Sequence, residues 1–202
     1  IAPSYGMAET TVYISASKWN REPIIKKFDN NNIEANNQAI ISIAKNHKKL
    51  VACGDGSFMK KLWIVDPRTK RKCENGRIGE IWVQDDSVAK GYWQKPEATK
   101  EIFHAYETST GEGPVLRTGD LGFFYDGQLY IAGRNKDLII IRGQNIYPQD
   151  IEFMVEESHP SLRKNCCACF SVTSDGEEKL VIVQEARCDS DTAAEIFSEI
   201  LN

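Results

Sequence analysis

Two short polar segments hold the residues of this chain that are best suited to chemistry. RTGDLG (residues 117–122) contains Asp120 after a Thr-Gly turn, and GRNKD (residues 133–137) contains Arg134. Both oxygens of a carboxylate can accept hydrogen bonds from neighbouring hydroxyls, so Asp120 suits a vicinal diol. An arginine offers several rigid donors to a ribose or phosphate oxygen. Taken singly, each residue could be a turn aspartate or half of a surface ion pair, but together they predict a nucleotide site.

The segment between these two must bring their side chains to one place. FFYDGQLYI (residues 123–131) contains Asp126-Gly127, a residue pair typical of a two-residue hairpin turn. An acid and a base are therefore expected at the two ends of one β-ribbon. Short strand-like runs separated by turns extend over residues 50–132, and this pattern indicates an antiparallel barrel or a twisted sheet.

A second unit is expected to begin near Gly133. The order strand, helix, strand, strand, helix over residues 133–202 is typical of a small α+β module, here incomplete. Its first helix should bury Ile151, Met154 and Val155, which stand at i, i+3 and i+4. The predicted fold class is therefore α+β, with a barrel-like antiparallel part first and the small module second.

Composition restricts the class of protein. The 202 residues have a formal net charge of −4, which together with the lack of a basic stripe argues against a nucleic-acid surface. No apolar run approaches the roughly 18 residues that a membrane span needs. Of six cysteines, Cys166, Cys167 and Cys169 are interpreted as buried thiols in a strand, because a zinc site would need a second ligand pair. Free thiols predict a reducing, cytoplasmic location.

Four segments occur in a fixed order along the chain. They are YGMAETT (5–11), GEIWV (79–83), RTGDLG (117–122) and GRNKDLIIIRGQNIYPQDIE (133–152). In that order they resemble the adenylate-forming (acyl-activating) enzymes, which include acyl-CoA synthetases, luciferases, peptide-synthetase adenylation domains and fatty acyl-AMP ligases. The resemblance implies that residues 1–132 are the C-terminal part of a large AMP-binding domain. Residues 133–202 would then be most of a small mobile domain, truncated at its end.

The resemblance implies roles for particular residues. Tyr5, Gly6 and Met7 correspond to the segment that packs against adenine and hydrogen-bonds it, where a flat aromatic ring can cover a purine. Glu9 corresponds to the acid associated with Mg²⁺, a cation that prefers hard carboxylate oxygens while it bridges phosphates. The alternative for Glu9 is a capping or solvated acid. Asp120 corresponds to the acceptor of the ribose diol, and ATP and Mg²⁺ are the implied cofactors.

Two further positions follow from the fourth segment. Arg134 resembles the arginine that meets the ribose and phosphate region, and with Glu9 it is the residue expected to act in catalysis. Lys136 falls at the hinge between the large and small domains, where family members have Asp or Lys. Ala8 departs from the commoner motif, in which a threonine hydroxyl often reaches the phosphates. YGMAE is, however, the form that fatty acyl-AMP ligases tend to have.

The spacing between motifs favours one branch of the family. The polar block at residues 17–47 lengthens the chain between Glu9 and Gly54, and it matches in position the insertion of fatty acyl-AMP ligases, which disfavours thiolation by CoA. The resemblance thus implies activation of a fatty acid with ATP to acyl-adenylate and pyrophosphate. The acyl group would pass to an acyl carrier protein or to a polyketide or peptide synthetase. The alternative for the block is an expanded surface loop without function.

Two other functions stay open, an acyl-CoA synthetase and a non-catalytic homologue that binds an adenylate or a protein partner. The phosphate loop of the family precedes the YGMAE segment, and its late catalytic lysine would follow Asn202. The chain is therefore expected to be a C-terminal fragment. Without those groups to stabilise the charge that develops at the phosphates, the isolated chain is predicted to have no adenylation activity.

Overall fold

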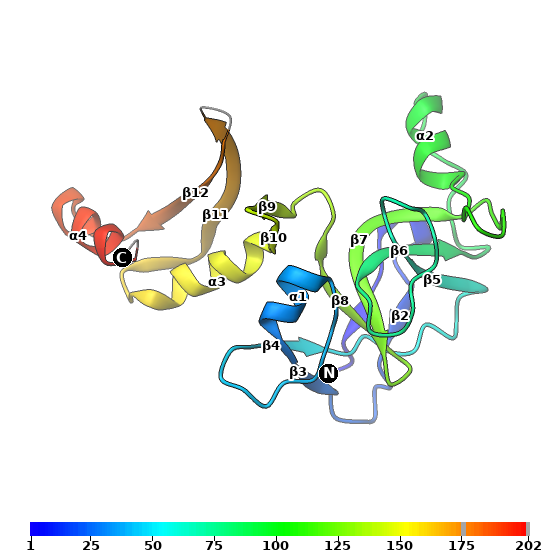
Figure 1. The fold of residues 1–202 in the computed structure, drawn as a ribbon, viewed down its shortest axis with the longest axis horizontal. Helices are drawn as coiled ribbons and strands as arrows, with labels where there is room; N and C mark the ends of the chain where they lie inside the picture. The colour runs from blue at the N-terminus through cyan, green and yellow to red at the C-terminus, as the bar shows by residue number, and fades with distance from the viewer. Residues whose placement is uncertain (175–176, 201–202) are drawn as a thin grey trace. The chain divides into compact units, whose positions relative to one another are not determined.

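The computed structural model describes residues 1–174 and 177–200, and the chain divides into two compact units, Ile1–Lys136 and Asp137–Asn202 (Figure 1). The elements of the first unit are β1 (Ser4–Tyr5), the 3-10 helix η1 (Ala8–Thr10), β2 (Ser15–Ala16), β3 (Ile25–Asp29), α1 (Asn30–Asn36), β4 (His47–Val51), β5 (Lys61–Val65), β6 (Gly79–Gln84), α2 (Pro96–Phe103), β7 (Leu116–Tyr125) and β8 (Gln128–Arg134). Those of the second are β9 (Ile139–Ile141), β10 (Gln144–Ile146), α3 (Pro148–Ser158), β11 (Leu162–Ser174), β12 (Glu177–Ala186) and α4 (Ser190–Ile200).

An antiparallel sheet of four strands forms the centre of the first unit, in the order β5-β6-β7-β8. Successive residues of a strand point to opposite faces, and both Ile81 and Trp82 of β6 are fully buried, so the sheet is covered on both sides. The cluster around Ile81 contains Ile14, Ile64, Val83 and Leu129, and that around Trp82 contains Val65 and Val115. Because β6 is the most enclosed strand, it is the rigid support of its neighbour β7.

The mixture of helices and antiparallel strands agrees with the predicted α+β class. The predicted closure into a barrel is not confirmed. In the part of the chain that the structure describes, the four-stranded sheet is open, and every other sheet has two strands. The short strands of residues 50–132 thus follow the predicted pattern without closing a ring, since no ladder joins β5 to β8.

Strands β7 and β8 form the predicted hairpin. Tyr125 pairs with Gln128, and the turn residues Asp126 and Gly127 have φ of 48° and 70°. Positive φ at both central residues is what a type I′ turn requires, and Asp-Gly tolerates it better than most pairs. The turn therefore fixes the register from which the remaining pairs of the ladder are counted.

The polar block at residues 17–47 has more structure than its sequence indicates. β3 and β4 form an antiparallel pair in continuous register. Phe28 of β3 is fully buried and meets the ring of Phe123 edge to face. Asp29 caps α1, because its side chain accepts a hydrogen bond from the backbone N–H of Asn32 at 2.8 Å. One aromatic anchor and one cap thus order a segment rich in Lys and Asn.

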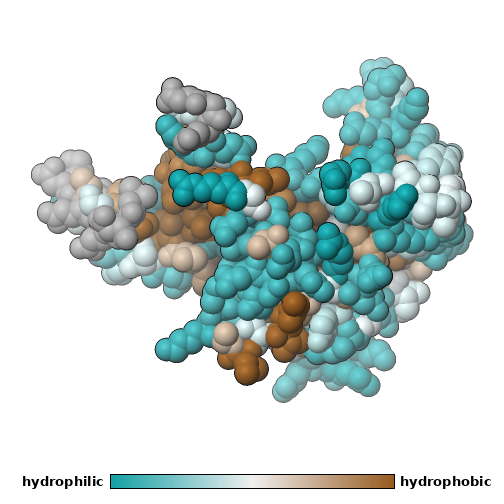
Figure 2. Space-filling model, viewed as in Figure 1, coloured by the Kyte–Doolittle hydropathy of each residue, from teal (hydrophilic) through white to brown (hydrophobic). Residues whose placement is uncertain are grey.

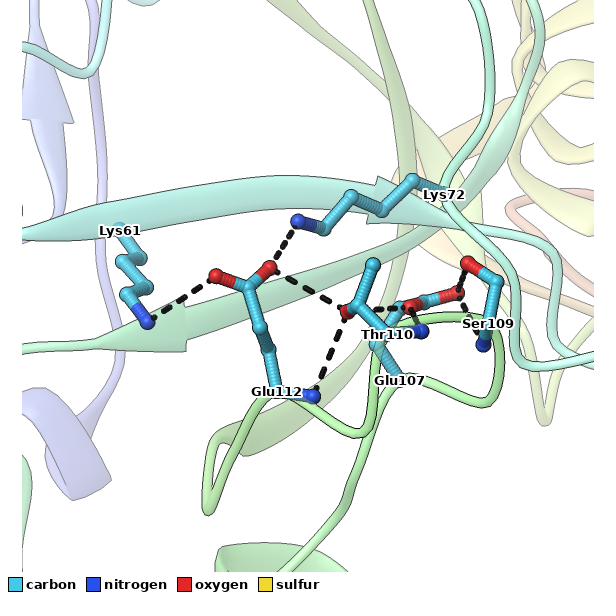
Figure 3. A network of polar contacts seen from close by, with 6 residues as sticks. All are labelled: Lys61, Lys72, Glu107, Ser109, Thr110 and Glu112. Carbon is cyan, nitrogen blue, oxygen red and sulfur yellow. Dashed lines mark hydrogen bonds and ion pairs between the residues drawn. The ribbon is translucent and has the colours of Figure 1, made fainter.

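A polar network ties the loop before β7 to its surroundings (Figure 3). Its members are Lys61, Lys72, Glu107, Ser109, Thr110 and Glu112. Glu107 is fully buried, and its carboxylate accepts four hydrogen bonds, of 2.6–3.0 Å, from the backbone N–H groups and hydroxyls of Ser109 and Thr110. These donors, the Ser109 hydroxyl first, lower the pKa of Glu107 to about 2. Glu112 pairs with Lys72 and, at 3.6 Å, with Lys61.

The second unit is built around the antiparallel pair β11 and β12. Val155 of α3 is buried with Leu162 and Ile196, and Ile151 packs against this cluster. The prediction for Met154 is wrong, because its side chain is 66% exposed. Ile151 and Val155 stand one helical turn apart and define a narrow buried stripe, and Met154 falls beside it.

All six cysteines are free thiols. Within the CCACF run the prediction of buried thiols holds for Cys169, whereas Cys166 and Cys167 are half-buried. Burial raises the pKa of Cys169 to about 11, so its thiol stays protonated at neutral pH. No group of three metal-ligating side chains occurs among residues 1–174 and 177–200.

The surface in view is mostly hydrophilic, with scattered hydrophobic patches (Figure 2). Large exposed apolar side chains include Trp19, Ile43, Phe58 and Trp93, and all four lie outside helices and strands. They therefore do not interrupt the packing of the sheets. In the described residues, no helix combines the length and the apolar character required to cross a bilayer.

Candidate nucleotide site

Asp120 and Arg134 are directly opposite each other in the β7–β8 ladder. Near the turn the register pairs Gly122 with Ile131, but beyond it Leu121 pairs with Gly133. One extra residue, Ala132, therefore lies on β8 without an opposite partner, as in a β-bulge. Without this bulge Asp120 would face Gly133, and Arg134 would be directed to the other face. The bulge is what brings the predicted acid and base together.

The Asp120 carboxylate has one donor on each oxygen. The Tyr5 hydroxyl donates to Oδ2 at 2.8 Å, and Arg134 Nε donates to Oδ1 at 3.2 Å. The Asp120 side chain is 15% exposed, whereas that of Arg134 is 70% exposed. Each carboxylate oxygen has room for a second hydrogen bond. The group can therefore accept two further hydroxyls from solvent or from a ligand.

Tyr5 reaches Asp120 from the opposite end of the sequence. It lies in β1, where its backbone carbonyl accepts from the N–H of Ile14 at 3.0 Å, and its ring packs on the cluster around Ile81. Burial, followed by the negative charge of Asp120, raises the pKa of the Tyr5 phenol. The hydroxyl therefore stays protonated and remains a donor. The structure thus brings together three of the predicted residues, Tyr5, Asp120 and Arg134.

A buried ion pair supports the turn that carries Asp120. Glu80 of β6 is 1% exposed and accepts hydrogen bonds from Arg117 Nε at 3.0 Å and Trp82 Nε1 at 2.9 Å. Its other oxygen accepts from the backbone N–H of Gly119 at 3.2 Å. Sequence reasoning missed Glu80, although a lone acid inside the apolar strand GEIWV was a usable signal, since a buried charge needs partners.

Gly6 and Met7 shape the loop between β1 and η1. A Cβ atom on Gly6 would lie 1.7 Å from the carbonyl oxygen of Val12, so only glycine allows this close approach of two backbone segments. The carbonyl of Met7 accepts from the N–H groups of Thr10 and Val12, at 3.1 and 2.9 Å. Its side chain packs against the same core cluster as the Tyr5 ring. The loop therefore has a single well-defined course between Tyr5 and Glu9.

Glu9 has a partner that the sequence did not suggest. Tyr92 donates its hydroxyl to Oε1 of Glu9 at 2.7 Å, and the backbone carbonyl of Glu9 accepts from the N–H of Ala89 at 2.8 Å. Burial and then this hydrogen bond raise the pKa of Tyr92 to about 12. Tyr92 is itself held by the start of α2, where its N–H donates to Thr99 Oγ1 at 2.9 Å. No described contact joins Glu9 to Asp120.

The donor set near Glu9 agrees with a nucleotide-bound magnesium ion rather than with an all-protein metal site. Oε2 of Glu9 has no hydrogen bond to the described residues, and no third metal-ligating side chain stands near it among them. Mg²⁺ in nucleotide sites usually takes one or two carboxylates and completes its shell with phosphate oxygens and water. A single half-exposed carboxylate fits that pattern.

Lys136 is the last residue of the first unit. Its side chain is exposed, and the preceding residue, Asn135, donates its N–H to the carbonyl of Gly119 at 2.8 Å. The ladder therefore ends at Arg134, and one further backbone hydrogen bond, from Asn135, precedes Lys136.

Comparisons with known proteins place this geometry in context. No family model matches the chain. It is 47% identical over 186 residues to the medium-chain-fatty-acid–[acyl-carrier-protein] ligase JamA of Moorena producens, and this match covers 91% of the chain and 31% of that protein. It is 43% identical over 193 residues to a putative fatty-acid–CoA ligase, fadD25, of Mycobacterium tuberculosis, covering 93% of the chain and 32% of the relative.

A solved structure from work on fatty acyl-adenylate ligases of E. coli and L. pneumophila matches with a TM-score of 0.83 and 30% identity. That match covers 98% of this chain and 34% of the solved one. The chain therefore spans about a third of the length of the relatives that it matches.

Proposed function

We propose that the chain belongs to the adenylate-forming (acyl-activating) enzyme family and forms part of a ligase that converts a fatty acid and ATP to acyl-adenylate and pyrophosphate. The observation that carries the proposal is the Asp120 carboxylate, which is held between the Tyr5 hydroxyl and Arg134 Nε with acceptor capacity left on both oxygens. Such an acceptor matches the two hydroxyls of a ribose.

The reaction is attack of a fatty-acid carboxylate on the α-phosphate of ATP, with pyrophosphate as the leaving group. Catalysis then depends on positioning and on cationic stabilisation rather than on a protein nucleophile. We assign Asp120 to the ribose diol and Arg134 to the ribose and phosphate region. Tyr5, Gly6 and Met7 are assigned to the adenine, and the packed ring and ordered loop of that segment support this.

Glu9 is assigned to the magnesium ion that accompanies the phosphates. When bound, the ion would neutralise phosphate charge. The free Oε2 atom of Glu9 supports the assignment, since it is a hard oxygen ligand that no other side chain of the described residues occupies.

Lys136 is assigned to the hinge between a large domain, which would include residues 1–132, and a small mobile domain, residues 133–202. The boundary between the two compact units, directly after Lys136, supports this assignment. The block at residues 17–47 is assigned to the insertion that restrains the small domain. Its order around Phe28 supports a structural role over that of an expanded surface loop without function.

The proposed acceptor of the acyl group is an acyl carrier protein, either free or in a polyketide or peptide synthetase. JamA, the relative at 47% identity, is named for transfer to an acyl carrier protein. A second candidate is CoA, because fadD25, at 43% identity, is named a fatty-acid–CoA ligase.

One assay of the full-length protein tests these proposals. It would receive a fatty acid, ATP and Mg²⁺, together with either carrier protein or CoA. Fatty-acid-dependent pyrophosphate release with acyl carrier protein as the main thioester product would support the proposal. Acyl-CoA as the main product would support the second candidate, and absence of pyrophosphate release would favour the non-catalytic alternative.

A further inference from the structure

The hydroxyl of Tyr5 has a contact that packing against a purine does not explain. A ring that only covers adenine needs its face, yet the Tyr5 oxygen is directed at Oδ2 of Asp120, 115 residues away in sequence, at 2.8 Å. Tyr5 is anchored by its backbone in β1 and by its ring in the core, so its hydroxyl is a fixed point. The Asp120 carboxylate is the group that this fixed hydroxyl orients.

Two donors hold the Asp120 carboxylate, and they differ in strength. Arg134 is 70% exposed, and an ion pair with an exposed side chain is weakened by solvent. The Tyr5 hydroxyl is largely shielded and donates to a charged acceptor, which makes it the stronger restraint. The backbone under Asp120 is fixed as well, since its N–H donates to Thr118 Oγ1 at 3.1 Å.

We propose that Tyr5 is a positioning residue that orients the Asp120 carboxylate for a vicinal diol, so that the site selects ribonucleotides partly through the Tyr5 hydroxyl. The inference rests on the proposed function, because it assumes that Asp120 accepts the ribose hydroxyls. With Oδ2 fixed by Tyr5 and Oδ1 by Arg134, one acceptor direction stays free on each oxygen. Two adjacent hydroxyls can donate one hydrogen bond to each oxygen, and a ligand without these hydroxyls can donate neither bond.

The test compares the binding of AMP and 2′,3′-dideoxy-AMP to the full-length protein by calorimetry. In Tyr5→Phe the ring stays and only the hydroxyl is removed. We expect this variant to bind AMP about 10- to 150-fold more weakly, as for loss of a hydrogen bond to a charged group, and to bind the dideoxy nucleotide within about two-fold of the unchanged protein. Tyr106→Phe, at an exposed tyrosine, is the matched control and should change neither affinity.

Other outcomes overturn the inference. Equal weakening of both nucleotides would show that the hydroxyl acts on the adenine or on folding rather than through Asp120. Unchanged AMP affinity would show that it positions nothing. If the unchanged protein bound neither nucleotide, the proposed function would fail first and the inference with it.

A second variant covers the case in which Tyr5→Phe does not fold. Replacing Tyr5 with 4-aminophenylalanine keeps an N–H donor at the same ring position and should retain the preference for AMP over the dideoxy nucleotide within about two-fold. Loss of the preference in this folded variant would also overturn the inference.

Discussion

Tyr92 donates its hydroxyl to Oε1 of Glu9 at 2.7 Å, which links the segment before α2 to η1 across 83 residues of sequence. The bond fixes one carboxylate oxygen and leaves the other directed away from it. We therefore predict that Tyr92→Phe raises the Mg²⁺ concentration needed for half-maximal pyrophosphate release about 10- to 150-fold in the full-length enzyme, as expected for loss of a hydrogen bond to a charged group. An Mg²⁺ titration at saturating ATP measures this, with Tyr106→Phe as control. An unchanged half-saturation point would exclude a positioning role for Tyr92.

Gly6 is expected to tolerate no side chain. Gly6→Ala would place Cβ 1.7 Å from the Val12 carbonyl oxygen, and backbone atoms cannot rotate away as a flexible side chain can. We predict a loss of about 2–3 kcal/mol or more in the free energy of unfolding, measured by urea denaturation. Gly111→Ala is the matched control, because nothing lies within 4 Å of its Cβ position and its φ of 70° is the main source of strain. Similar losses for both variants would contradict the steric explanation.

Substitution of Glu80, the buried acid of strand β6, is expected to lower the stability of the protein strongly. Glu80→Gln keeps the size of the side chain but removes the buried counter-charge of the half-buried Arg117 guanidinium, whose other acidic partner is the exposed Glu101 at 4.0 Å. Breaking a buried pair from one side costs about 3–5 kcal/mol, so we predict a loss near the lower bound of that range. Urea unfolding measures it, and Glu185→Gln, in an exposed pair with Arg163, should change stability little. A loss for Glu80→Gln as small as that for the control would show that the pair is not needed.

Because of Glu107, the free energy of unfolding should depend on pH in the acid range. Its pKa is about 2 in the folded protein, below the ordinary 4.5, because the Ser109 and Thr110 donors stabilise the charged form. A lowered folded pKa gives stability that is fully present above pH 4.5 and is lost as the pH falls toward 2. We predict that Glu107→Gln is less stable than the unchanged protein at pH 7 and that the gap narrows between pH 4.5 and 2. Urea midpoints across this range test it, and a gap independent of pH would contradict it.

The sequence predicted part of the site and not the rest. Asp120 and Arg134 were expected at the ends of one ribbon because Asp126-Gly127 is a strong turn signal, and the hairpin is confirmed. Their direct contact depends on the bulge at Ala132. This bulge was not predicted from the sequence Ile-Ala-Gly at residues 131–133. Tyr92 was missed because its partner is 83 residues away.

The strands of the polar block illustrate the same limit. Lys and Asp are depleted in strands, so residues 25–29 and 47–49 gave no strand signal. Their order comes from Phe28, whose burial against Phe123 is a tertiary contact. Barrel closure was expected from strand count and spacing, but spacing does not determine whether the edge strands pair.

The bulge at Ala132 restricts where this hairpin can change its length. Side chains alternate between faces, so one residue added to or removed from either strand would direct Asp120 and Arg134 to opposite faces, whereas a longer turn leaves their register unchanged. Proteins that retain this pair should therefore keep the bulge and differ in length only at the turn. The place of an insertion thus becomes a criterion for whether a related chain can keep its acid and its base on one face.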